Sequence, residues 1–147
     1  YGIQKGIAPK DFAAWKEFER ESLKKQFDGI FLLFGDQLYL APKDMPALKG
    51  LKVLRPGLHL GTMKKGRFEP SQALAMNLRM QEFVNYLNFN ASDERTIRYL
   101  KGETLTAAEE EAADGLVLIC VDGFPLGWAQ KRGGQLKNKY NPGWRWQ

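Results

Sequence analysis

The sequence predicts an α+β fold, in which small antiparallel sheets are flanked by helices and the C-terminal end forms a partly closed β-barrel. Apolar runs of strand length alternate with turn residues, and longer segments carry apolar residues at helical spacing. No internal repeat or low-complexity segment is present. With 147 residues, 44% of them hydrophobic, the chain fits one domain or two small lobes with a real core.

The first part of the chain is predicted to hold a helix and a hairpin. Pro9 opens a helix whose apolar residues recur at helical spacing as far as Phe27, and Asp28-Gly29 ends it. The runs GIFLLF and QLYL then predict a strand hairpin around Gly35-Asp36.

The next segments predict a loop, two strands and a second helix. APKDMPALKG (residues 41–50) is a proline-punctuated loop, and LKVLRPGLHLGTMKKGRF (51–68) indicates two short strands around Pro56-Gly57 with a basic loop. PSQALAMNLRMQEFVNYL (70–87) starts with proline and has the apolar positions of a mostly buried helix.

The second half is predicted to begin with two short helices. Ser92 is the expected N-cap of the first, which runs through Leu100 and stops at Gly102. A capping box over 106–109 predicts an acidic surface helix that Asp114-Gly115 closes.

Three strands are expected to follow. GLVLICVDG predicts a buried strand, and FPLGWAQKR is its hairpin partner across Asp122-Gly123. Gly133-Gly134 then turns the chain into QLKNKY.

Charge is unevenly distributed along the chain, whose net charge is +5 and whose pI is about 9.3. Residues 43–67 carry seven cations against one acidic residue, and the closing residues 123–147 carry five cations and no acidic residue. Residues 103–114 carry five acidic residues and no cation. This pattern predicts a basic face, which suits nucleic acid or another anionic surface.

Residues that could carry catalysis are scarce. The chain has no GxxxxGK[ST] or GxGxxG segment. His59, the only histidine, is expected at a half-exposed strand position, with a phosphate contact as the alternative. Cys120 is expected to be a buried small hydrophobe rather than a nucleophile. We therefore expect no catalytic, cofactor-binding or metal-binding residue, and no enzymatic activity of the chain alone.

Cysteine use and hydropathy bear on location. The single cysteine excludes an internal disulfide and a cysteine-based zinc site, which favours a reducing, cytoplasmic compartment. No apolar run approaches the roughly 18–20 residues that span a bilayer, so we expect no membrane association. The first residues, YGIQKGIAPK, lack Met and a signal-peptide core, so we expect a fragment of a longer protein. Separately, we expect the chain to be a monomer.

The closing stretch, GFPLGWAQKRGGQLKNKYNPGWRWQ, interleaves cations with aromatic rings. Trp128 alternates with Leu126 along a strand, which predicts a core position. Trp144 and Trp146, on either side of Arg145, either cap the barrel or lie exposed. The cations around Gly133-Gly134 form either a solvated hairpin tip or a surface that binds phosphates.

Three segments resemble one family. VDGFPLGWAQKRGGQLKNKYNPGWRW (121–146) resembles the C-terminal PUA-like segment of RsmF-like bacterial ribosomal RNA cytosine-C5 methyltransferases, which are related to the Sun family. RYLKGETL (98–105) looks like the turn that opens that domain, and LKGLKVLRPGLHLGTMKKGRFEPSQALA (48–75) is similar to a stretch of their connecting domain. The resemblance covers roughly residues 27–146, with the segments in the expected order.

The resemblance implies a connecting α+β domain over residues 1–84 and a PUA-like RNA-binding domain over 85–147. Full-length members carry an N-terminal domain that binds S-adenosylmethionine and methylates C5 of a cytosine in ribosomal RNA, using two cysteines. This chain would lack that domain and would bind no cofactor. Its implied partners are small-subunit ribosomal RNA and the missing methyltransferase domain.

On PUA folds RNA lies near the glycine-containing loop after the first helix and against the adjacent strand, and that loop is Leu100–Glu103 here. We expect backbone contacts from Arg98, Lys101, Gly102, Lys131, Arg132, Lys137, Asn138 and Lys139. Tyr140 and Arg145 are further candidates for base stacking or phosphate contact, and Lys64, Lys65 and Arg67 form a second basic loop.

The alternative is a structural or protein-interaction module that packs on the catalytic domain or on a ribosomal protein. Joint exposure of Trp144 and Trp146 would favour a protein partner. A continuous stripe of lysine and arginine over buried tryptophans would favour RNA.

Overall fold

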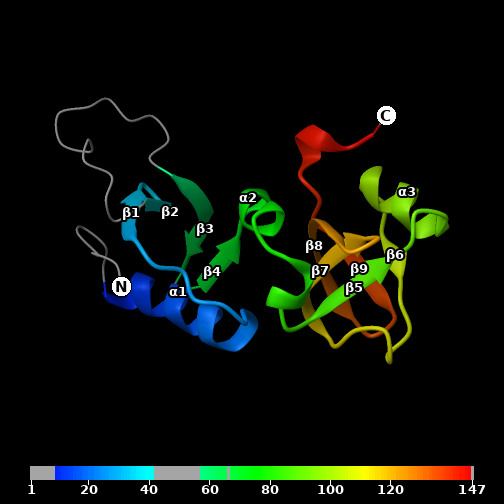
Figure 1. Cartoon of the computed structure of the whole chain (residues 1–147), viewed down its shortest axis with the longest axis horizontal. Coiled ribbons are helices and arrows are strands. Elements are labelled where there is room, and N and C mark those ends of the chain that lie inside the picture. Colours follow the sequence, from blue (N-terminus) through cyan, green and yellow to red (C-terminus); the bar gives the residue numbers. More distant parts are fainter. Residues whose placement is uncertain (1–8, 42–56, 66, 147) are drawn as a thin grey trace. The chain divides into compact units, whose positions relative to one another are not determined.

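The computed structural model describes residues 9–41, 57–65 and 67–146, and the chain divides into two compact units, residues 1–74 and 75–147 (Figure 1). The loop predicted at 42–50 and the strand predicted within 51–56 lie outside the described residues. The division comes earlier in the chain than the predicted domain boundary between 84 and 85, which stays a prediction.

The first unit is a four-stranded antiparallel sheet that packs against one helix. The strands lie in chain order: β1 (Ile30–Phe34), β2 (Gln37–Ala41), β3 (Leu58–Lys64) and β4 (Arg67–Pro70). Helix α1 (Pro9–Ser22) packs against β4. Trp15 is fully buried between them, with its ring centroid 5.0 Å from that of Phe68 and 6.0 Å from that of Phe31. The predicted β1–β2 hairpin is confirmed.

Helix α1 ends at Ser22, before the predicted Phe27. The last helical hydrogen bond runs from Leu23 N to Glu19 O at 3.1 Å. The side chain of Glu19 then accepts from Phe27 N at 2.8 Å. In a longer helix the amide of Phe27 would bond to a backbone carbonyl, but here it bonds to the Glu19 carboxylate and the chain turns back. The centroid of the Phe27 ring then lies 6.0 Å from that of the Trp15 ring.

The helix predicted over 70–87 is wrong beyond its first turns. Helix α2 (Gln72–Met76) is followed by a 3₁₀ turn, η1 (Met80–Glu82), and by strand β5 (Tyr86–Phe89). Phe83 is buried, and β5 pairs with a buried strand of the second unit. Tertiary pairing thus overrides the helical propensity of the segment.

The second unit is a five-stranded sheet that curls into a partly closed barrel (Figure 1). Its strand order is β5, β7 (Gly115–Val121), β8 (Phe124–Arg132), β9 (Gln135–Asn138) and β6 (Leu105–Thr106). Helix α3 (Glu94–Leu100) and the 3₁₀ turn η2 (Pro142–Trp144) complete it. The predicted fold class is confirmed, although the pair β5–β7 is parallel rather than antiparallel.

A β-bulge changes the direction of side chains on β8. The pairing register shifts between Ile119 and Cys120, which leaves Leu126 as an extra residue on β8. Leu126 packs against the barrel interior. Trp128 is buried as predicted, but its ring packs 4.9 Å from that of Phe83, outside that interior cluster.

Two local predictions in the second unit are wrong. The N-cap of α3 is Asp93, whose Oδ1 accepts from Arg95 N at 2.9 Å, while Ser92 Oγ donates to Asn90 Oδ1 at 2.6 Å. The acidic segment 106–114 forms turns rather than a helix.

The two residues considered for catalysis have the expected surroundings. His59 is half-buried on β3, with Nε2 2.7 Å from Gln37 Oε1. Cys120 is fully buried, and burial raises the pKa of its thiol to about 12. Within the described ranges, no helix is long and apolar enough to cross a bilayer.

Candidate nucleic-acid interface

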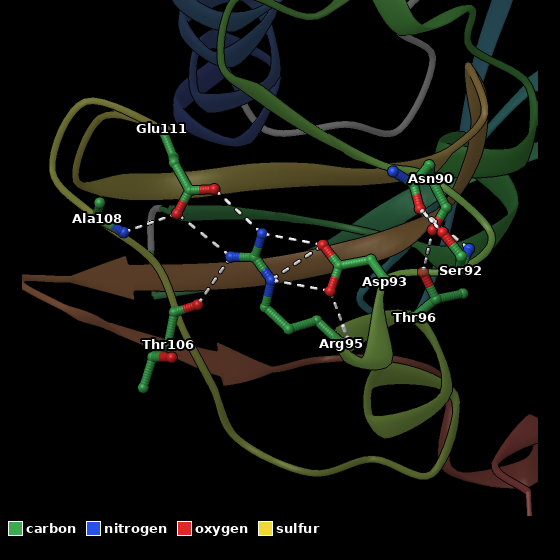
Figure 2. Close-up of polar contacts among 8 residues, drawn as sticks. All are labelled: Asn90, Ser92, Asp93, Arg95, Thr96, Thr106, Ala108 and Glu111. Carbon is green, nitrogen blue, oxygen red and sulfur yellow. Dashed lines mark hydrogen bonds and ion pairs between the residues drawn. The ribbon is translucent and has the colours of Figure 1, made fainter.

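Helix α3 is anchored at its N-terminal end by the Arg95 clasp, formed by Asp93, Arg95 and Glu111 (Figure 2). Arg95 Nη2 donates to Asp93 Oδ2 and to Glu111 Oε2, each at 3.1 Å. Its Nη1 donates to Thr106 O, also at 3.1 Å. The guanidinium carbon lies 4.6 Å from the centroid of the Phe89 ring. The clasp thus joins α3 to the acidic segment and to the barrel wall.

Hydrogen bonding shifts the pKa of each clasp member. Bonds from Arg95 hold the pKa of the Asp93 and Glu111 carboxyls below their usual values, and Ala108 N adds a bond to Glu111 at 2.8 Å. The same carboxylates raise the pKa of the Arg95 guanidinium. Since these three charges satisfy one another, the clasp is a structural element rather than an anion site.

The turn after α3 is the glycine-containing loop on which RNA contact was predicted. Gly102 has φ +85° and ends the helix as expected. Asn138 on β9 holds this turn, because its Nδ2 donates to Tyr99 O and Glu103 O, each at 2.9 Å. The amide of Asn138 is therefore used within the fold, which corrects our expectation of an RNA contact there. Arg98 pairs with Glu103 at 2.9 Å and is exposed.

The C-terminal segment returns to the same turn. Trp146 N donates to Leu100 O at 2.8 Å, and Arg145 Nε donates to Tyr140 O at 3.2 Å. A Cβ atom at Gly102 would lie 2.5 Å from Arg145 Cδ, so the arginine side chain lies directly on the glycine. Arg145 is thereby fixed beside the turn.

The β8–β9 hairpin presents cations on its outer side. Gln130 is paired with Lys137, and Arg132 is paired with Gln135; all four residues are exposed. Lys139, one alternation beyond Lys137, is exposed as well. Two-residue alternation therefore places these cations on the solvent side of the hairpin.

Lys131 lies on the opposite side of the same strand. Its side chain is 1% exposed, and Nζ donates to Gly133 O at 2.7 Å and to Asp114 Oδ1 at 3.2 Å. Hydrogen bonding to Lys131 lowers the pKa of the Asp114 carboxyl. Lys131 therefore stabilises the hairpin. Its ammonium group is buried away from the surface, which corrects the predicted phosphate contact.

Two further candidates are placed differently from the prediction. Tyr140 is 8% exposed, with its ring 5.2 Å from Tyr99 and 6.2 Å from Trp144, so it cannot stack on a base from solution. The second basic loop belongs to the other unit, where Lys64 pairs with Glu69 at 3.4 Å. Lys64, Lys65 and Arg67 are exposed and stay a separate prediction.

The predicted cations that remain available are here called the basic rim: Lys101, Arg132, Lys137, Lys139 and Arg145. Within the part of the chain that the structure describes, none of them forms an ion pair. They come from three neighbouring segments: the turn after α3, the β8–β9 hairpin and the C-terminal segment. Asn138 joins that turn to β9, and Arg145 lies on its Gly102.

The two C-terminal tryptophans resolve an alternative that the sequence left open. Trp144 and Trp146 are 49% and 51% exposed. They therefore do not serve as a buried cap of the barrel, and their exposure favours a protein partner for this end of the chain.

The curled sheet with α3 at one end and a cationic hairpin defines the second unit as a PUA-like domain. Two family models match the chain: "RsmF rRNA methyltransferase first C-terminal domain" over residues 17–78, and "Methyltransferase RsmF PUA domain" over residues 86–146. The chain belongs to the RsmF family of rRNA methyltransferases and carries these two C-terminal domains.

Curated relatives agree with this assignment. The ribosomal RNA small subunit methyltransferase F of Shewanella oneidensis is 26% identical over 133 residues, which are 89% of this chain and 27% of that protein. The protein of the same name from Shewanella baltica (strain OS223) is 27% identical over 113 residues, 76% of this chain and 23% of its own length. The chain thus spans about a quarter of the length of the curated relatives it matches.

Proposed function

We propose that this chain is the RNA-binding C-terminal portion of an S-adenosylmethionine-dependent rRNA (cytosine-C5) methyltransferase, and that it positions rRNA for a catalytic domain elsewhere in a longer protein. The observation that supports this most directly is the basic rim, in which Lys101, Arg132, Lys137 and Lys139 are exposed on a PUA-like domain and, among the described residues, none of the five cations forms an ion pair. The relatives are named as small-subunit rRNA methyltransferases, which supports rRNA as the ligand.

Phosphate neutralisation supplies the affinity in this proposal. Each lysine or arginine that meets a phosphate releases condensed counterions, so the binding constant falls with salt. Five rim cations give an expected slope of log K against log salt of about −3.5 to −4.5, from about 0.7–0.9 per contact. The cofactor, S-adenosylmethionine, would be held by the catalytic domain.

Fluorescence anisotropy of a labelled small-subunit rRNA fragment tests the proposal, between about 50 and 200 mM salt. The variant Arg132→Ala/Lys137→Ala/Lys139→Ala removes three rim cations and should make the slope shallower by about 2–2.7. Gln130→Ala/Gln135→Ala is the matched control, because it changes exposed residues of the same strands without changing charge. Unaltered affinity and slope in the triple variant would refute RNA binding through the rim.

The exposed tryptophans support a second candidate function, docking onto the catalytic domain or another protein. On this view Trp144 and Trp146 provide apolar contact area next to Arg145. The variant Trp144→Ser/Trp146→Ser should then weaken association with a separately produced methyltransferase domain, measured by calorimetric titration, while RNA affinity is retained. Loss of RNA affinity alone would remove this candidate.

A further inference from the structure

The face of the four-stranded sheet that points away from α1 carries a row of aromatic side chains. Helix α1 covers the face on which Phe31 packs against Trp15. Because side chains alternate along a strand, Phe34 on β1, three residues after Phe31, lies on the opposite face. The centroid of the Tyr39 ring lies 5.8 Å from that of Phe34 and 4.9 Å from that of His59. These three side chains, from β1, β2 and β3, are here called the aromatic face.

A polar network holds the aromatic face in place. Gln37 on β2 is paired with Phe34 on one side and with Thr62 on the other. Its Oε1 accepts from Thr62 Oγ1 at 3.1 Å and lies 2.7 Å from His59 Nε2. Its Nε2 donates to Asp36 Oδ1 at 2.8 Å. The orientation of the row is therefore fixed before any ligand binds, which lowers the entropy cost of binding.

The aromatic face does not serve as the core of the first unit. On the side of α1, Trp15 and Leu38 are fully buried and supply that core. Phe34 is instead 52% exposed, and Tyr39 and His59 are half-buried. Single exposed apolar residues are ordinary on protein surfaces, whereas a contiguous exposed patch marks a binding site. A row that crosses three strands is such a patch.

Cations lie at one end of the aromatic face. Lys64 and Arg67 are paired across β3 and β4, and both are exposed. Lys65, in the turn between these strands, has φ +49° and is exposed as well. Lys64 pairs with Glu69 at 3.4 Å, but among the described residues neither Lys65 nor Arg67 forms an ion pair. Two cations thus remain against one nearby carboxylate, that of Asp36, and this excess suits a polyanion.

We propose that the aromatic face binds single-stranded RNA, with bases stacked on its rings and phosphates at Lys65 and Arg67. Aromatic rings beside cations bind single strands, because every base has a π-face. In a duplex the bases are stacked on one another, so the rings select unpaired segments. Two inter-strand spacings and one alternation along β3 separate Phe34 from Lys64, about 12 Å in all, so one short segment reaches both. That the ligand is RNA rests on the proposed function, whereas the binding face rests on the geometry of the sheet.

Fluorescence anisotropy of the whole chain tests the stacking, with a labelled single strand of about 10 nucleotides and a duplex of the same sequence. Phe34→Ala removes an exposed ring and should weaken binding of the single strand roughly 5- to 150-fold, without weakening binding of the duplex. Phe34→Tyr is the matched control that keeps a ring and should retain the affinity. Phe34→Leu keeps an apolar side chain without a ring and should bind as weakly as the alanine variant. Full affinity in Phe34→Ala or Phe34→Leu, or an equal loss for the duplex, would overturn the proposal.

The salt dependence of single-strand binding tests the cations. Lys65→Ala/Arg67→Ala should make the slope of log K against log salt shallower by about 1.4, from about 0.7 per phosphate of a single strand. Lys65→Arg/Arg67→Lys keeps both charges and should leave the slope unchanged. An unchanged slope in the alanine variant would contradict phosphate contact at this turn.

A crosslinking readout on the unmodified chain makes the result independent of variant folding. Ultraviolet crosslinking of a thiouridine-substituted single strand, followed by proteolysis and mass spectrometry, should give adducts on β1 or β2; adducts on the barrel alone would refute the aromatic face.

Running the rim triple variant in parallel separates this proposal from the proposed function. If only the rim variant loses affinity, the aromatic face fails and the proposed function stands. If only Phe34→Ala loses affinity, RNA binding through the rim fails and the aromatic face stands. If neither variant loses affinity, both proposals fail.

Discussion

The contact between Arg145 and Gly102 gives a prediction that a double-mutant cycle can measure. In Gly102→Ala, the new Cβ must occupy a φ of +85°, which costs about 1–2 kcal/mol for an L residue. It also lies 2.5 Å from Arg145 Cδ, so the arginine moves and loses its 3.2 Å bond to Tyr140 O. That bond contributes about 0.5–1.5 kcal/mol, which gives a total loss of roughly 1.5–3.5 kcal/mol.

In the Arg145→Ala background the overlap and the hydrogen bond are already gone, so Gly102→Ala should cost only the conformational 1–2 kcal/mol or so. The cycle should therefore show a coupling of about 1 kcal/mol between the two positions, measured from urea unfolding of all four chains. Additivity within about 0.3–0.5 kcal/mol would refute the reasoning, because it would mean that Arg145 does not lie on Gly102.

Three further predictions follow from buried charge and burial. Asp114→Asn should destabilise the second unit more than Lys131→Met, because it leaves the 1% exposed ammonium without its carboxylate; comparing urea midpoints checks this. The Asp93 and Glu111 carboxyls have a lowered pKa in the folded chain, so their contribution to folding stability is present above about pH 5 and is lost as the pH falls through their folded pKa values. Arg95→Met should therefore remove this acid-dependent loss of stability, which a pH series of unfolding midpoints would show. Cys120 should react with a thiol reagent at pH 8 no faster than the barrel opens, because the thiol is fully buried; reaction within the mixing time would contradict this.

Local sequence signals predicted the strands of the second unit well. GLVLICV and FPLGWAQKR match β7 and β8 residue for residue, because an apolar run and a turn of positive-φ residues, Asp122-Gly123, determine both ends. The segment 70–87 failed for the opposite reason. Its periodicity suits a helix, but its last residues pair with a strand about thirty positions away. The local hydrophobic pattern carries no information about that pairing.

The sequence predicted which cations gather at the candidate site, but it did not predict which of them are exposed to a ligand. Charge counting identified the basic end, and alternation could have placed Lys131 opposite Arg132 on the barrel's inner side. Its burial depends on Asp114, a partner 17 positions away. The roles of Asn138 and Tyr140 likewise depend on contacts with α3 that form only in the folded chain.

The parallel strand β5 has a consequence for how the second unit resists aggregation. It covers the edge of β7, whose seven residues, GLVLICV, carry no charge and no proline. A chain cut after Phe89 would leave that edge with open amides and carbonyls on a strongly apolar strand, which is a template for intermolecular β-pairing. The four residues of β5 therefore protect the barrel against self-association. Any shortened chain should begin before Tyr86 to remain soluble.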